Sequence, residues 1–138
     1  MLHLARRGGA TRLLARSLSA AAGKPYAQLS VGVPKETVFL ERRVSQTPET
    51  VAGLVKEGFV VKVERGAGAA AAFPDAAYVA AGAELVDAAG AFGASIVTKV
   101  AVPTAEEAKS IGDRTLIGFF WPAQVRSVSS LGAGGRSI

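Results

Sequence analysis

A short apolar strand followed by a charged turn and a helix start is the feature that most constrains the fold. Residues 29–33 form an apolar run that Pro34 ends, and Thr47-Pro48-Glu49 follows a polar stretch. Threonine can cap a helix, proline suits the first helical position, and glutamate complements the positive end of the helix dipole. Val51 and Val55 then recur at helical spacing before Gly58, a residue typical of helix ends. The segment therefore predicts a strand joined to a helix.

The rest of the chain repeats this alternation. Apolar runs at 59–64, 83–86, 95–100 and 115–120 predict strands, and helix starts occur at Pro74-Asp75, Asp87 and Thr104. Strands that alternate with short helices indicate βαβ units, so we expect an α/β fold. We predict a flavodoxin- or Rossmann-like doubly wound, largely parallel sheet with right-handed crossovers. The expected core residues are Val31, Val33, Val51, Leu54, Val55, Val61, Val63, Leu85, Ile96, Val97, Val100, Ile117 and Phe119.

The two ends differ in composition from the central part. Residues 1–24 contain five basic residues, no acid and several leucines and serines, which is typical of an organellar transit peptide. Residues 125–138 are rich in Ser and Gly and lack apolar periodicity, so we expect a disordered or aberrant tail. One folded domain is therefore expected over residues 25–124.

The charge and the residue types exclude several classes of function. The net charge of +5 comes from the ends, because residues 25–124 carry nine basic and eleven acidic side chains. A nucleic-acid-binding face is therefore not expected. The sequence has no cysteine and a single histidine, His3, so we expect no metal site, no thiol chemistry and no catalytic triad. Its apolar stretches are shorter than the ~20 residues of a membrane helix, so we expect no membrane contact from this chain itself.

The run Val31-Gly-Val-Pro-Lys-Glu-Thr37, with Arg42-Arg43-Val44 and Thr47-Pro48 after it, resembles the alanine dehydrogenase/pyridine nucleotide transhydrogenase family. The resemblance covers roughly residues 29–124 and implies the N-terminal α/β domain, which in the family precedes a separate NAD-binding domain. Two positions distinguish the branches of the family. Alanine dehydrogenases have a second basic substrate ligand where Ala101 stands here and a catalytic histidine where Trp121 stands. The Pro122-Ala123-Gln124 ending instead resembles the transhydrogenase branch, although a basic residue is usual at position 101 there as well.

Four residues are candidates for a substrate cleft: Arg43, Lys35, Lys99 and Gln124. The resemblance gives Arg43 the role of holding a substrate carboxylate; the alternative is a salt bridge to Glu36 or Glu41. Lys35 and Glu36 either face the cleft between domains or form an exposed ion pair. Lys99, on an otherwise apolar strand, lies either in a cleft or at a solvated strand end.

The glycines of Gly66-Ala67-Gly68 follow a strand but do not form a dinucleotide-binding motif, because Ala71 stands where the third glycine is needed. We therefore predict no catalytic residue and no tight cofactor binding by this chain alone.

The resemblance implies the N-terminal part of a proton-translocating NAD(P) transhydrogenase, which moves hydride from NADH to NADP. NAD and NADP would be cofactors of the full-length parent, and the partners would be the remaining transhydrogenase domains and a second copy in a homodimer. It implies a mitochondrial location, with the plastid as the alternative. An alanine dehydrogenase-like or saccharopine dehydrogenase-like oxidoreductase fragment and a non-catalytic, truncated binding module remain the other hypotheses.

Overall fold

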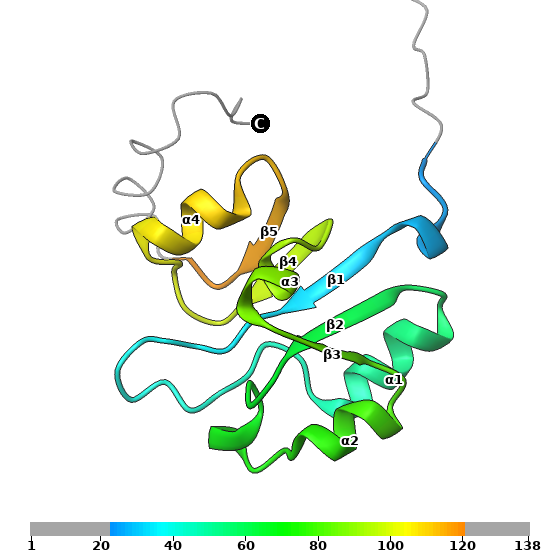
Figure 1. The fold of residues 1–138 in the computed structure, drawn as a ribbon, viewed down its shortest axis with the longest axis horizontal. Helices are drawn as coiled ribbons and strands as arrows, with labels where there is room; N and C mark the ends of the chain where they lie inside the picture. Colours follow the sequence, from blue (N-terminus) through cyan, green and yellow to red (C-terminus); the bar gives the residue numbers. More distant parts are fainter. Residues whose placement is uncertain (1–22, 121–138) are drawn as a thin grey trace, which may run out of the picture.

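A computed structural model describes residues 23–120, which form one parallel sheet with helices around it (Figure 1). The strands are β1 (Ser30–Val33), β2 (Val60–Glu64), β3 (Glu84–Val86), β4 (Ile96–Lys99) and β5 (Thr115–Gly118). The helices are α1 (Pro48–Lys56), α2 (Asp75–Ala80), α3 (Ala88–Phe92) and α4 (Ala105–Ile111), with 3-10 turns η1 (Tyr26–Gln28) and η2 (Ala69–Ala71). All strand pairs are parallel, in the order β3-β2-β1-β4-β5. The predicted α/β fold is confirmed, and the strand order is of the Rossmann type rather than the flavodoxin type.

Three helices begin where their capping residues predicted. The Thr47 side chain accepts a hydrogen bond from the Thr50 amide at the start of α1, and Asp87 accepts one from the Gly90 amide at the start of α3. Thr104 begins α4 with a capping box, in which its side chain and that of Glu107 each accept a hydrogen bond from the other's amide. These local interactions satisfy amides that have no partner within the helix.

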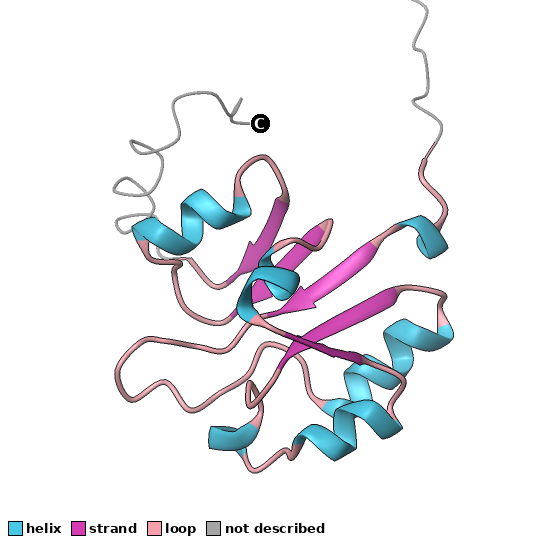
Figure 2. Ribbon diagram, in the orientation of Figure 1, coloured by secondary structure: helices cyan, strands magenta, loops and turns pink. Residues whose placement is uncertain are grey.

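The sheet has helices on both faces, in the two groups that Figure 2 shows around it. One face of β1 and β2 packs against α1 and α2 through a core of buried residues: Val31, Val33, Val51, Val61, Val63, Ala67, Tyr78 and Ala83. A smaller cluster of Phe92 from α3, Val97 from β4 and Ile111 from α4 lies on the opposite face. Side chains alternate between the faces of a strand, so Gly32 faces α3 while its neighbours face α1 and α2.

Two residues predicted to lie in the core are exposed. Ile117 is 55% exposed and Phe119 is 83% exposed. Ile117 lies in β5, the edge strand next to β4, and Phe119 follows it, whereas α1 and α2 lie beside β2 and β3, away from β5 (Figure 1). The prediction was wrong here because apolar alternation identifies a strand but not whether a helix covers each of its faces.

The longest helix of residues 23–120 is α1, with nine residues, so no helix in this range has the length and apolar character needed to cross a membrane.

Candidate functional site

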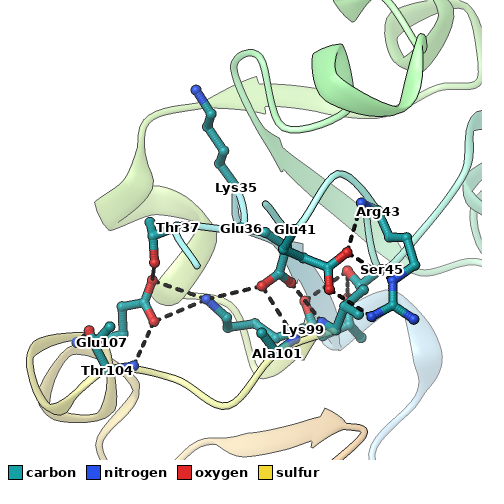
Figure 3. A network of polar contacts seen from close by, with 12 residues as sticks. Lys35, Glu36, Thr37, Glu41, Arg43, Ser45, Lys99, Ala101, Thr104 and Glu107 are labelled. Carbon is teal, nitrogen blue, oxygen red and sulfur yellow. Dashed lines mark hydrogen bonds and ion pairs between the residues drawn. The ribbon is translucent and has the colours of Figure 1, made fainter. Parts of the chain in front are cut away.

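The candidate site lies at the carboxyl edge of the sheet, between β1 and β4. The chain leaves β1 for β2 on one side, whereas β4 pairs with β1 on the other. Such a reversal of strand order is where α/β sheets open a crevice for ligands, beyond the carboxyl ends of the strands. The loop of residues 34–47 leaves β1 at this edge, and Lys99 ends β4 beside it (Figure 3).

Lys99 is fully buried, and carboxylates surround its ammonium group. The Nζ atom donates to both carboxylate oxygens of Glu107, at 3.0 Å each, and lies 3.6 Å from Oε2 of Glu36. It also lies 6.0 Å from the centre of the Phe92 ring. The alternative of a solvated strand end is therefore wrong, because α4 and the β1–α1 loop cover the end of β4. The three N–H donors of the ammonium all face groups of the protein itself.

Glu36 turns inward and caps the backbone at the end of β4. Its Oε1 accepts the Val100 amide at 2.7 Å, and its Oε2 accepts the Ala101 amide at 3.3 Å. The alternative of an exposed ion pair between Lys35 and Glu36 is wrong, since the two side chains diverge. The backbone amide of Lys35 donates to Glu64 at 2.8 Å, and its exposed side chain points away from the cluster (Figure 3).

Glu107 completes the cluster from the first turn of α4. Its carboxylate accepts hydrogen bonds from the Thr104 amide at 2.8 Å and the Thr37 hydroxyl at 3.1 Å, in addition to those from Lys99. Burial raises the pKa of the Glu107 carboxyl, but the hydrogen bonds from Thr104, Lys99 and Thr37 outweigh it and hold that pKa below its ordinary value. Glu107 is not among the site residues predicted from the sequence. The Thr-x-x-Glu spacing of a capping box could have placed its carboxylate over the helix end.

Arg43 forms a two-point salt bridge with Glu41 in the exposed part of the loop. Its Nε and Nη2 donate to the two carboxylate oxygens at 2.8 and 2.6 Å, and its backbone amide donates at 2.9 Å. These hydrogen bonds lower the pKa of Glu41 from 4.5 to about 2 and raise that of Arg43. The salt-bridge alternative thus applies to Glu41, while the Arg43 side chain remains 73% exposed. A role for Arg43 in holding a substrate carboxylate stays a prediction.

The far end of the same loop is also fastened, to β4 and to α2. The Ser45 hydroxyl donates to the Thr98 carbonyl at 2.8 Å, and the Tyr78 hydroxyl donates to the Gln46 carbonyl at 2.9 Å. Between these points and Glu36 the tip is exposed, with Phe39 at 88% and Leu40 at 79%. The loop is therefore tied at both ends and open in the middle.

The turn at Gly66-Ala67-Gly68 does not fit the phosphates of a nicotinamide cofactor. The Gly66 amide donates to the Asp75 carboxylate at 2.9 Å, and a Cβ on Gly68 would lie 2.6 Å from the Tyr78 ring. An amide bonded to a carboxylate and a glycine packed under an aromatic ring leave no cradle for an anion. Gln124, the fourth candidate, and Trp121 lie outside the described residues.

Comparison with known proteins gives this fold and site a family. Residues 32–133 match the family described as "Alanine dehydrogenase/PNT, N-terminal domain", and the chain belongs to it. It is 43% identical over 99 residues to NAD(P) transhydrogenase subunit alpha of Cereibacter sphaeroides, covering 70% of this chain and 19% of that protein. It is 44% identical over 78 residues to alanine dehydrogenase of Bacillus subtilis, covering 56% of this chain and 21% of that enzyme.

A solved structure of the transhydrogenase from Sinorhizobium meliloti has the same fold. The TM-score is 0.71 at 35% identity, over 76% of this chain and 32% of that structure. The chain spans about a fifth of the length of the curated relatives that it matches. The resemblance to the transhydrogenase alpha subunit extends over more of the chain than the resemblance to alanine dehydrogenase.

Proposed function

We propose that this chain forms the N-terminal part of an NAD(P) transhydrogenase and supplies one wall of the cleft in which NAD binds. Hydride would pass from NADH to NADP only when the remaining transhydrogenase domains are present, coupled there to proton translocation. The 43% identity to a transhydrogenase alpha subunit supports this assignment. The Gly66-Ala67-Gly68 turn does not cradle phosphates, so the chain's own contribution would be the surface that faces the nucleotide.

The observation that carries the proposal is that internal carboxylates already engage Lys99 and Arg43 at the sheet edge. Lys99 is buried between two glutamates, and Arg43 is bonded to Glu41. Position 101, where alanine dehydrogenases carry a cation, offers only a methyl group. The resemblance gives the carboxylate site of alanine dehydrogenases two cationic ligands, of which only Arg43, with its outer edge exposed, would remain here. This edge suits a transhydrogenase, which has no such substrate, better than an alanine dehydrogenase.

Within this proposal, the exposed Lys35 and the outer edge of the Arg43 guanidinium would face the cleft, and Gln124 remains a candidate for it from the sequence. Lys99 belongs to the same edge of the sheet. The alternatives are an alanine dehydrogenase-like fragment, supported by 44% identity over a shorter stretch, and a non-catalytic module that binds its full-length relative.

A reconstitution experiment tests the proposal. The chain would be co-expressed with a Cereibacter sphaeroides subunit alpha that lacks the matching N-terminal part, together with the remaining transhydrogenase subunits. Hydride transfer from NADH to NADP should appear only when the chain is present, and an Arg43→Ala chain should restore less. Alanine-dependent reduction of NAD by the same preparation would overturn the assignment in favour of an alanine dehydrogenase. Binding to the truncated subunit without hydride transfer would favour the non-catalytic module.

We further propose that residues 1–24 direct the chain to the mitochondrion, that 25–124 form the domain, and that 125–138 are a tail outside it. Five basic residues and no acid in 1–24 support the first point. Import into isolated mitochondria followed by N-terminal sequencing of the processed product tests it. Import into plastids alone would overturn it.

A further inference from the structure

We infer that Glu36, Lys99 and Glu107 form a latch that positions the β1–α1 loop, and that Lys99 is a positioning residue rather than a ligand of the cleft. The latch joins three segments that are far apart in sequence: the start of the loop, the end of β4 and the first turn of α4. The inference rests on the proposed function only in placing Arg43 of that loop at the cleft.

Every polar group of the latch has a partner inside the protein. Lys99 faces two carboxylates, and Glu107 accepts hydrogen bonds from the Thr37 hydroxyl and the Thr104 amide as well. Within residues 23–120 no buried side-chain nitrogen or oxygen lacks a hydrogen-bond partner. Because the ammonium is 0% exposed, a ligand could reach it only by breaking the latch. Lys99 can thus affect the cleft only through the groups that it holds.

The group through which it acts is Glu36. The ammonium and the Ala101 amide both face Oε2 of this carboxylate, and the Val100 amide donates to Oε1. Glu36 therefore fastens the loop to the end of β4 immediately before residues 37–43, which have little packing of their own. Val38, Phe39 and Leu40 are 45%, 88% and 79% exposed, and Leu40 adopts a left-handed φ of 64°. With so few apolar contacts at the tip, polar fastening determines where Arg43 lies.

The test is amide exchange and ¹⁵N relaxation by NMR on the full 138-residue chain, comparing wild type with Glu36→Gln. This isosteric change leaves the Lys99–Glu107 pair intact, so the fold should persist. We expect the Val100 and Ala101 amides to exchange roughly tenfold faster or more, since they lose a charged acceptor. Order parameters over residues 37–43 should fall from about 0.85 towards 0.6. Amides of β2 should be unchanged.

Two further variants separate the latch from general stability. Val51→Ala makes a cavity on the opposite face of the sheet, so it should raise exchange throughout the domain without a selective effect on the loop. Glu107→Gln retains the capping box, because glutamine also serves at that position, but removes the charge that faces Lys99. It should loosen residues 37–43 as Glu36→Gln does.

The inference is overturned if the loop and the two amides are unchanged in Glu36→Gln, or if the change spreads evenly over the sheet as in Val51→Ala. This experiment uses no nucleotide. It therefore fails or succeeds independently of the reconstitution assay for hydride transfer.

Discussion

The helix α3 packs closely against β1 at Gly32. A Cβ built on this residue would lie 2.0 Å from the Ala91 carbonyl oxygen and 2.9 Å from the Ala94 Cβ, whereas ordinary contacts begin at 3.4 Å. Gly32→Ala therefore requires α3 to move by more than 1 Å. Ala91 and Ala94 are both 0% exposed, so there is no free space for this shift. Overpacking of this kind costs about 3 kcal/mol at the upper end of its usual range.

A smaller effect of opposite sign comes from the unfolded state. Alanine restricts the unfolded chain more than glycine does, which stabilises the folded state by about 0.4–1 kcal/mol. We expect Gly32→Ala to lower the free energy of unfolding by about 2–3 kcal/mol. That loss corresponds to a fall in Tm of roughly 10–20 °C for a domain of this size. Urea unfolding and thermal unfolding, both followed by far-UV circular dichroism, measure the two quantities.

Gly53→Ala is the matched control, since it makes the same change within α1, where a Cβ would meet nothing within 4 Å. This variant should be stabilised by about 0.5–1 kcal/mol, because alanine favours a helix interior over glycine. Opposite signs for the two substitutions would support the reasoning. If Gly32→Ala were as stable as wild type while Gly53→Ala behaved as expected, the close approach of α3 to β1 would be refuted.

Three further predictions concern the site and the helix that follows it. Because the folded pKa of Glu107 is depressed, its stabilisation is present above the unfolded pKa and is lost as pH falls through the folded value. Unfolding measured from about pH 6 to about pH 3, which brackets the ordinary value of 4.5, should therefore show a shallower loss for Glu107→Gln than for wild type. Arg43→Ala should return the pKa of Glu41 from about 2 towards 4.5, seen in an NMR titration of its carboxyl group. Thr47→Ala removes the cap of α1 and should cost about 1 kcal/mol in urea unfolding, and no loss would show that Thr47 is not a cap.

Local signals in the sequence were sufficient for the elements of the fold. Thr47, Asp87 and Thr104 each begin a helix because a capping residue and the amides that it satisfies lie within one turn. The strand order could not be predicted in the same way. The Rossmann and flavodoxin orders differ in where the chain crosses the sheet. Which crossover forms depends on tertiary packing and not on the local sequence. The same limitation placed Ile117 in the core, since its neighbours across the face come from distant segments.

The sequence predicted that Lys99 ends a strand, but not which groups it contacts. Lys99 attracted attention as a lysine on an apolar strand, and the structure places it at the expected edge of the sheet. Its partner Glu107 is eight residues away, and Glu36 reaches an amide that is 64 residues away. Charge and spacing alone could not distinguish a ligand from the centre of an internal cluster, because only the packing of three segments removes Lys99 from solvent.

The latch also gives a physical account of the neutral residue at position 101. Two carboxylates around one ammonium leave an excess of negative charge in a buried place, which is costly unless further donors compensate. The Val100 and Ala101 amides supply that compensation to Glu36, and the Thr37 hydroxyl and the Thr104 amide supply it to Glu107. The group that position 101 contributes to the cluster is therefore its backbone N–H. A methyl side chain at position 101 therefore leaves the contacts of Glu36, Lys99 and Glu107 intact.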